Sequence, residues 1–311
     1  MLEDNAKIQK MVEIAKMYYE EDLTQNEIAR RIGVSRPLVS KMLSDAKEAG
    51  IVTISIKSPF ATDELLMEDI KQLYNIEGGM VIPRSDTDYL TDQVILNNVI
   101  SYIENNLKNC KKFGLGWGKI ISDLVQKMEI SEKKMELDGY VCPLVGNIAM
   151  PTKDFHSNEL VMVFSQMTKL KPSYLFAPAF LDSEQEKSMF VNIENYKSIE
   201  KLWKKLDVVL LGVGNHPSVP DLATASRFGD KLHKEKAVGN ILSYYYDKKG
   251  KVIEGDNDFS IEIPLEDLRK VKQVIGICSS KTSRDAVIGA LKTGLITHLI
   301  IDEVKAKEII S

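Results

Sequence analysis

The chain has 311 residues, a formal net charge of −4, 44% hydrophobic residues and 28% charged residues. This length favours two domains over a single small one, and its apolar runs fall short of the ~18 residues that a membrane-spanning helix needs. The opening stretch MLEDNAKIQK mixes charges of both signs, which argues against a secretory signal and predicts a cytoplasmic protein. Cys110, Cys142 and Cys278 are far apart and lack C-x-x-C spacing, so we expect small core side chains rather than disulfides or a metal site.

Basic residues gather near the N-terminus although the chain as a whole is acidic. Residues 24–47 contain five basic and two acidic side chains, which gives this window a charge of +3. Phosphate binding depends on such local patches rather than on the total charge. The pattern therefore indicates contact with nucleic acid in this part of the chain.

Helical spacing and capping signals predict the first two helices. Apolar residues recur at helical spacing from Lys7 to Glu21, which predicts an amphipathic helix. Thr24 followed three residues later by Glu27 is the capping-box pattern, so a second helix begins there. We expect it to end before Gly33, because glycine tolerates the left-handed turn that closes a helix.

A third helix is predicted directly after this turn. Ser35 is its expected cap, and Pro37 lies in its first turn, where the missing N–H costs nothing. The side chains expected to hold it to the other two helices are Leu38, Val39, Met42, Leu43 and Ala46. The side chains left to face outward are Ser35, Arg36, Ser40, Lys41 and Ser44. Helix, tight turn and helix in this order are typical of a DNA-binding unit.

The outward face of the third helix suits the DNA major groove. Arginine can pair with guanine through two hydrogen bonds, while serine and lysine reach bases or phosphates. Backbone N–H groups at the start of the second helix are expected to bind a flanking phosphate. The predicted DNA-binding residues are Thr24, Gln25, Ser35, Arg36, Pro37, Ser40 and Lys41. The alternative is a helical hairpin whose basic face is simply solvated.

Alternating residues from Ile51 to Ile56 predict a strand, the wing of a winged helix-turn-helix. After Ser58-Pro59 short apolar runs alternate with helical patterns, which predicts an α/β domain with a largely parallel sheet covered on both faces. Strands are expected within 78–83 and at 113–115, 140–144, 174–177, 208–211, 274–278 and 299–301. Helices are expected at 61–76, 90–107, 119–127, 157–168 and 283–291. We therefore expect a winged helix-turn-helix domain at 1–57 and an α/β effector and oligomerisation domain at 58–311.

Small and polar residues follow several predicted strands, where open parallel sheets bind their ligands. The stretch GLGWGKI contains Gly116, Gly118 and Lys119 and enters a helix, a geometry that suits either an anion or tight packing. The stretch LDVVLLGVGNH ends in Gly214 and Asn215, which let a ligand approach the backbone. These two turns are candidate parts of a binding site.

Two further strand ends carry candidate residues. CPLVGNIAM places Gly146 and Asn147 after a strand, and ICSSKTSRDAVIGAL places Lys281 and Arg284 at the start of a helix. Cations at a helix N-terminus oppose its dipole unless an anion lies between them, so a phosphate or carboxylate site is expected here, or else a solvated basic turn. His216 is a candidate general base, but a lone histidine is more often a loop residue.

The order of motifs in both halves resembles the SorC family of bacterial sugar-sensing transcription regulators. The motifs that carry the resemblance cover nearly the whole chain: SRPLVSKML, GLGWGKI, PLVGN, FAPAF, DVVLLGVG, AVGNILSYYYDKKG and GALKTGLITHLIIDE. The resemblance implies a winged helix-turn-helix joined to an effector domain of the sugar-phosphate isomerase/deaminase-like type, commonly assembled as a tetramer. It also implies that a sugar or phosphorylated sugar changes the affinity for operator DNA.

The resemblance implies an effector cleft lined by Gly116, Gly118, Lys119, Gly146, Asn147, Gly214, Asn215, Asp247 and Lys281. Relatives often carry threonine after the WG turn for holding phosphate, whereas this chain has Lys119 followed by two isoleucines. The lysine that forms a Schiff base in one related regulator corresponds to a position near Val145. The same covalent chemistry is therefore excluded at that position.

We expect a DNA-binding transcription regulator controlled by a sugar, sugar alcohol or sugar phosphate, without enzymatic activity, cofactor or metal. Its expected partners are operator DNA, the effector and further copies of the chain in a tetramer or dimer. The alternative is a sugar-phosphate isomerase or deaminase-like enzyme, since the fold hosts such reactions and GVGNH resembles a deaminase loop. However, the predicted strand ends carry no pair of carboxylate and histidine for acid–base chemistry. A third hypothesis is an architectural DNA-binding protein whose second domain binds nothing.

Overall fold

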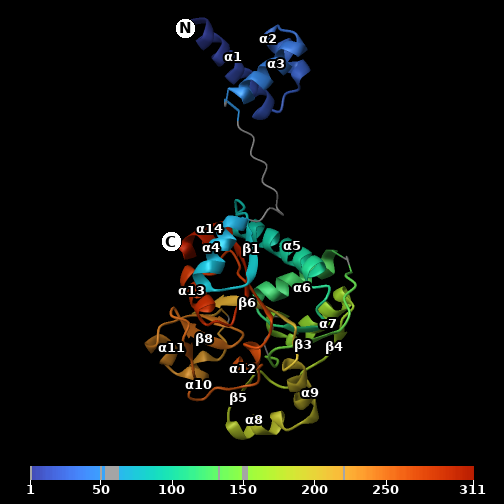
Figure 1. Cartoon of the computed structure of the whole chain (residues 1–311), viewed down its shortest axis with the longest axis vertical. Helices are drawn as coiled ribbons and strands as arrows, with labels where there is room; N and C mark the ends of the chain where they lie inside the picture. Colours follow the sequence, from blue (N-terminus) through green and yellow to red (C-terminus); the bar gives the residue numbers. More distant parts are fainter. Residues whose placement is uncertain (1, 50, 53–62, 132–133, 149–152, 220) are drawn as a thin grey trace. The chain divides into compact units, whose positions relative to one another are not determined.

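The structure is a computed structural model of the chain that describes residues 2–49, 51–52, 63–131, 134–148, 153–219 and 221–311 (Figure 1). The chain forms two compact units, Met1–Lys57 and Ser58–Ser311. Among the described residues, no helix is both long and apolar enough to cross a membrane.

The N-terminal unit contains the three predicted helices, α1 (Leu2–Tyr19), α2 (Gln25–Ile32) and α3 (Arg36–Glu48). Ile14, Ile28 and Val39, one residue from each helix, are fully buried in a common cluster. Leu38 was expected to be buried, but it is 37% exposed. The buried side of α3 follows the helical period from Val39, and Leu38 lies about 100° away from it around the axis.

The predicted wing is only partly covered by the structure. Ile51 and Val52 lie in a bend after α3. The rest of the predicted strand, residues 53–56, lies outside the described residues.

The second unit is built on a parallel sheet whose strand order is β1-β12-β11-β6-β2-β3-β4. The strands of this sheet are β1 (Gly78–Ile82), β2 (Lys112–Leu115), β3 (Tyr140–Pro143), β4 (Lys171–Pro172), β6 (Val208–Asn215), β11 (Gln273–Ile277) and β12 (His298–Asp302). The continuous apolar runs of the sequence become these central strands, because a parallel sheet is buried on both faces.

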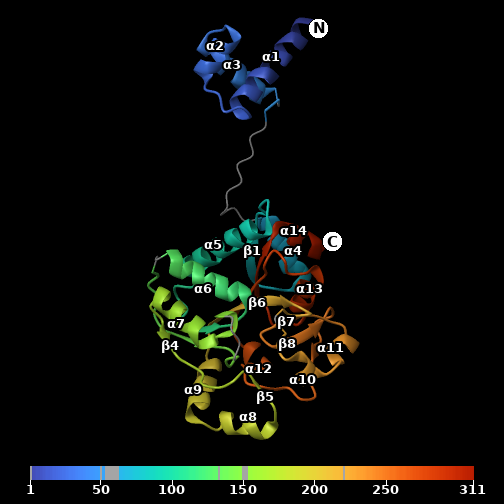
Figure 2. The same ribbon diagram turned by 180° about the vertical axis from the view of Figure 1, so that it is seen from behind.

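Helices cover both faces of the sheet. Figures 1 and 2 show one group on one side, α5 (Asp88–Asn106), α6 (Lys119–Ser131) and α7 (Ser157–Thr168). On the other side lie α4 (Glu64–Tyr74), α13 (Arg284–Lys292) and α14 (Glu303–Ile310). The predicted layered α/β architecture is thereby confirmed.

The direction of the chain reverses between β2 and β6. From β2 the chain proceeds to β3 and β4 on one side, whereas from β6 it proceeds to β11 and β12 on the other. In open α/β sheets such a switch point leaves a crevice at the carboxyl ends of the two strands. The glycine-rich turn after β2 and the end of β6 are therefore neighbours at the expected ligand position.

Several elements were not predicted. An antiparallel extension of β6 contains β7 (Ala237–Ile241), β8 (Tyr244–Asp247) and β9 (Val252–Ile253). A second small sheet pairs β5 (Phe180–Leu181) with β10 (Phe259–Ser260). Short helices complete the unit: η1 (Lys153–Phe155), α8 (Glu184–Val191), α9 (Glu194–Trp203), α10 (Thr224–Phe228), α11 (Lys231–Lys234) and α12 (Leu265–Leu268).

The strand predicted at 174–177 is wrong. The strand that pairs with β3 is β4, three residues earlier. Side-chain amides take the backbone groups that a strand would use: Asn158 bonds both the N–H and the carbonyl of Leu175 at 3.0 Å. Asn195 accepts from the Phe176 N–H at 2.8 Å. The segment is therefore held as an irregular connection.

Candidate functional site

The start of α2 is fixed by a complete capping box. The Glu27 N–H donates to the Thr24 hydroxyl at 3.3 Å, and the Thr24 N–H donates back to the Glu27 carboxylate at 2.9 Å. The Thr24 hydroxyl also donates to the Glu27 carboxylate at 2.7 Å, and this bond, together with the one from the Thr24 N–H, lowers the pKa of Glu27. The N–H of Thr24 is thus occupied, whereas those of Gln25 and Asn26 lie in the first turn, where a helix offers no internal acceptor.

The turn between α2 and α3 has the predicted conformation. Gly33 ends α2 with φ = 68°, and its N–H bonds to the carbonyl of Ala29. Ser35 occupies the N-cap position of α3, but its hydroxyl makes no capping hydrogen bond, and Pro37 lies in the first turn. The predicted helix, turn and helix are therefore confirmed, with an unused serine hydroxyl at the start of α3.

The predicted DNA-binding side chains of α3 form one exposed face. Ser35, Arg36, Pro37, Ser40 and Lys41 are all exposed. Neither Arg36 nor Lys41 makes a hydrogen bond or ion pair with another described residue. Two cations are therefore available to an external anion.

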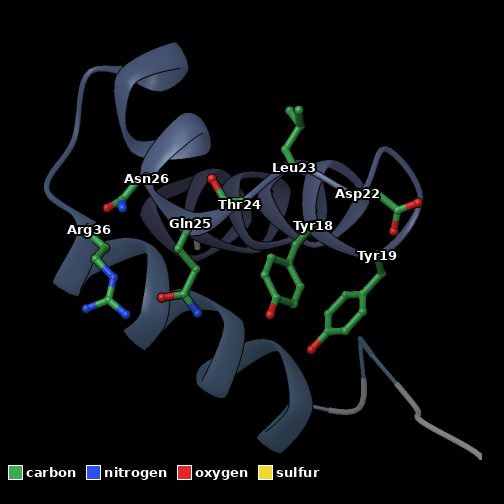
Figure 3. Close-up of a pocket in the computed structure, with 8 residues that line it drawn as sticks. All are labelled: Tyr18, Tyr19, Asp22, Leu23, Thr24, Gln25, Asn26 and Arg36. Atoms are coloured by element: carbon green, nitrogen blue, oxygen red, sulfur yellow. The ribbon is translucent and has the colours of Figure 1, made fainter.

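Sequence reasoning did not identify a hollow of about 590 Å³ beside this face (Figure 3). Its lining residues are Tyr18, Tyr19, Asp22, Leu23, Thr24, Gln25, Asn26 and Arg36. The sequence pattern from Lys7 to Glu21 predicted only an amphipathic helix, with no binding role for the two tyrosines near its end. The sequence feature that could have indicated this hollow is the pair of adjacent tyrosines close to the predicted DNA-binding turn.

In the second unit, the turn after β2 is shaped by two glycines. A Cβ on Gly116 would come within 3.1 Å of the Leu210 carbonyl oxygen, so a side chain there would require the backbone of β6 to shift slightly. Gly118 has φ = 98° with open space where a Cβ would lie. Lys119 points into solvent, with a side chain 73% exposed, and forms an ion pair with Asp123 one turn further along α6. The N–H groups of Ile121 and Ser122 donate to the Gly118 carbonyl at 3.1 and 2.9 Å, whereas those of Lys119 and Ile120 lie in the first turn of α6, where a helix offers no internal acceptor.

The structure brings Asn215 and Lys281 together. The Asn215 side-chain amide donates to the Lys281 carbonyl at 3.0 Å, and its oxygen accepts from the Ser283 N–H at 2.8 Å. The Lys281 side chain is exposed and makes no ion pair with the described residues. Arg284, the other candidate cation, donates instead to the carbonyl of Glu308 at 2.6 Å. Of these two candidate cations, Lys281 is therefore the one whose side chain has no internal partner among the described residues.

Four other predicted residues have internal roles. Gly146 allows close packing, because a Cβ there would lie 2.5 Å from the Pro178 carbonyl oxygen. The amide of Asn147 donates to the Leu175 carbonyl at 3.1 Å and accepts from the Asn158 N–H at 3.2 Å.

Asp247 accepts from two backbone N–H groups in the β8–β9 turn. Gly214 packs against the side chain of Asn240 across the β6–β7 pair.

His216 lies directly after β6 and packs edge-on against Tyr245, with ring centroids 5.3 Å apart. Burial lowers the pKa of His216, which favours the neutral ring. Its Nδ1 atom is buried and has no hydrogen-bond partner among the described residues. No carboxylate is bonded to the ring there, so the structure offers no oriented acid–base pair around it.

A buried charge network near the crevice was also missed. Arg227 is 2% exposed, forms two hydrogen bonds of 3.0 Å to the Asp258 carboxylate and lies 4.1 Å over the ring of Phe180. Glu262 is buried nearby, accepts from the Ser243 N–H at 3.1 Å, and burial raises its pKa to about 7. Phe180 in turn contacts Trp117 of the turn after β2. The network connects segments far apart in sequence, so no local pattern indicates it.

The N-terminal unit is a helix-turn-helix whose third helix carries cations without internal partners. The unit that follows it is an α/β domain whose sheet has a switch point between β2 and β6, where such folds bind ligands. Together they define a ligand-responsive transcription regulator. Residues 58–311 match the Sugar-bind family, a sugar-binding domain, and residues 17–53 match a winged helix-turn-helix DNA-binding family. The chain belongs to the SorC family of sugar-sensing transcription regulators.

The relatives are similar over nearly their full lengths. The chain is 28% identical to the deoxyribonucleoside regulator of Bacillus subtilis (strain 168), over 99% of each chain. It is 26% identical to the sorbitol operon regulator of Klebsiella pneumoniae, over 98% of this chain and 99% of the relative. The crystal structure of the full-length sorbitol operon regulator SorC from Klebsiella pneumoniae has the same fold, with a TM-score of 0.71, 23% identity and coverage of 98% and 99%. These relatives are regulators, which confirms the predicted class and gives no support to the enzyme alternative.

Proposed function

We propose that the exposed face of α3 binds operator DNA, with Arg36, Ser40 and Lys41 at base edges or phosphates. The observation that carries this proposal is that both cations are exposed and unpaired within the described part of the chain. A cation without an internal partner loses no ion pair when it binds a phosphate or guanine. Ser35 and Pro37 begin the same exposed face and are expected at its DNA-contacting end.

The start of α2 is proposed to bind a flanking phosphate. The Thr24 N–H is occupied by Glu27, so the backbone groups of Gln25 and Asn26 are the expected donors. The contribution of Thr24 is then to fix the helix start that presents them. Contacts of this kind set the position of a protein on the duplex without specifying sequence.

The proposed effector is an anionic sugar bound at the switch point, with Lys281 near its phosphate or carboxylate. Supporting this are the exposed Lys281 side chain and the first-turn N–H groups of α6, which flank the end of β6 from opposite sides. Gly118, Gly214 and Asn215 are proposed to line the same crevice. Lys119, Gly146, Asn147 and Asp247 are proposed to act mainly by shaping it, because their side chains have internal partners or pack tightly.

Regulation follows if the effector binds one arrangement of a homo-oligomer better than another. The effector then shifts the population toward that arrangement and changes the spacing of the DNA-binding units. A coupling free energy of ~1–3 kcal/mol would change operator affinity ~5- to 150-fold. We propose a dimer or tetramer that acts in the cytoplasm, where its operator DNA is accessible.

A thermal-shift screen against sugars, sugar alcohols and their phosphates tests the effector proposal, because a ligand specific to the folded state raises the melting temperature. We expect a rise only with phosphorylated compounds. The Lys281→Ala variant should lose that rise while binding effector-free DNA as the unaltered chain does. Lys272→Ala is the matched control, because Lys272 is exposed and lies at the other end of β11. A rise with free sugars alone would remove Lys281 from the site.

A further inference from the structure

The hollow beside α3 is lined mainly by polar and aromatic side chains, together with the aliphatic Leu23 and the acidic Asp22. Tyr18 and Tyr19 end α1 with their rings edge-to-face at 4.9 Å, and Tyr19 is 38% exposed. Figure 3 shows both phenolic oxygens pointing toward the ribbon of α3, with Arg36 across the same opening. Neither phenol makes a hydrogen bond with another described residue. Both phenolic hydroxyls are therefore available to donate hydrogen bonds to a ligand beside α3.

A second cation lies at the tyrosine end of the hollow. The ammonium of Lys47 lies 6.0 Å from the ring centroid of Tyr19, and Lys47 makes no ion pair with the described residues. Arg36 and Lys47 are eleven residues apart, close to three whole turns, so they lie on the same side of α3. The distance between them along the helix axis is ~16 Å at a rise of 1.5 Å per residue. The two cations therefore mark the ends of one line along α3.

The nearby carboxylates do not cancel this line of charge. Glu27 is held by the capping box with Thr24. Asp22 is the acidic residue of the lining, and Figure 3 places it at the opposite end from Arg36, the end where Lys47 adds a positive charge. An extended ligand with negative charge at intervals fits this arrangement better than a compact one.

We propose that this hollow binds the phosphate backbone of one DNA strand alongside α3. Lys47 neutralises one phosphate, and the hydroxyls of Tyr18 and Tyr19 donate hydrogen bonds to phosphate oxygens next to it. One strand carries a charge every ~3.4 Å of duplex axis, so a groove of ~16 Å spans several phosphates. This inference rests on the proposed DNA-binding role of α3 and adds a second row of contacts, from α1 and the end of α3.

The test uses the full chain and a mixed-sequence 30-base-pair duplex, because phosphate contacts do not depend on sequence. Binding is followed by fluorescence anisotropy at several salt concentrations. Lys47→Ala should reduce the slope of log affinity against log salt by ~0.9, the value for one lost phosphate contact. Lys10→Ala is the matched control, since Lys10 is exposed on α1 and lies half a turn round from Tyr19.

The tyrosines are tested separately from the charge. The double variant Tyr18→Phe, Tyr19→Phe keeps both rings and should bind about tenfold more weakly with an unchanged salt slope, because it loses neutral donors to charged acceptors. Tyr89→Phe, an exposed tyrosine of the second unit, should bind as the unaltered chain does. An unchanged slope for Lys47→Ala, or full affinity for the double variant, overturns the inference. Failure of the unaltered chain to bind any duplex at low salt would instead overturn the DNA-binding proposal itself.

Discussion

The face of α3 and the strand ends of the second unit use polar side chains in opposite ways. On α3 the cations Arg36 and Lys41 have no partner among the described residues, so this surface is ready for an external anion. At the strand ends, the amides of Asn147 and Asn215 and the carboxylate of Asp247 are all engaged with the backbone. The difference teaches that exposure alone does not mark a binding group, because the polar side chains of one unit lack internal partners whereas those of the other hold backbone segments in place.

The largest expected effect comes from breaking the buried network. Asp258→Ala leaves the buried Arg227 without its carboxylate, which should lower the free energy of unfolding of the second unit by ~3–5 kcal/mol. Urea denaturation measures this change. Asp256→Ala is the control, because its ion pair with Lys231 is at the surface, and its loss should cost less than ~1 kcal/mol. Equal stability of the two variants would contradict a structural role for the Arg227 pair.

A cation without an internal partner should affect DNA binding and not stability. Arg36→Ala should weaken DNA binding by ~1–3 kcal/mol and relax base preference, without changing the melting temperature. The measurement is anisotropy against a duplex selected from random sequence and against variants of it. Arg31→Ala is the control, because Arg31 is paired with Glu21 at 2.8 Å. A loss of the same size on every duplex would assign Arg36 to a phosphate instead of a base.

A smaller effect is expected at the start of α2, where Thr24 and Glu27 form the capping box. Thr24→Ala removes the capping hydroxyl and should destabilise this unit by ~1 kcal/mol. Hydrogen exchange of α2 amides measures the change locally. Ser44→Ala changes an exposed serine inside α3 and should leave exchange slow. Unchanged protection in Thr24→Ala would mean that the capping box contributes nothing.

A pH dependence of stability is expected from Glu262. Its pKa is raised to about 7 in the folded chain, so the folded state retains a proton that the unfolded state releases near its ordinary pKa of 4.5. Stability from this group should therefore fall as pH rises from about 4.5 to about 7 and stay level above that. Glu262→Gln should remove this fall in a series of urea titrations. Parallel pH profiles for the two proteins would exclude Glu262 as the titrating group.

Local signals predicted the N-terminal unit well. The capping box, Gly33 and the order of helices depend on residues a few positions apart, and all are present in the structure. Leu38 was misplaced because adjacent residues at the start of a helix differ by about 100° in direction, and sequence alone did not fix which of them faces the core.

Long-range contacts were beyond the reach of the same reasoning. The apolar run at 174–177 has strand composition, but Asn158 and Asn195 from distant elements take its backbone groups. Arg227, Asp258 and Glu262 meet only because the β5–β10 pair and the turn before β8 are brought together. The ends of the strands expected at 113–115, 140–144 and 274–278 were predicted to within one residue, whereas β6 continues to Asn215. The structure was also needed to separate Lys281 from Arg284.

The link from Asn215 to the turn after β11 has a consequence for how such a regulator can diverge. The amide bonds only the carbonyl of residue 281 and the N–H of residue 283, so the shape of the turn does not depend on the side chain at 281. A descendant gene can therefore exchange that lysine for a neutral or acidic residue without disturbing the neighbouring strands. Under the proposal that Lys281 contacts the effector, one codon would set the charge of the ligand that is sensed, while the scaffold stays constant.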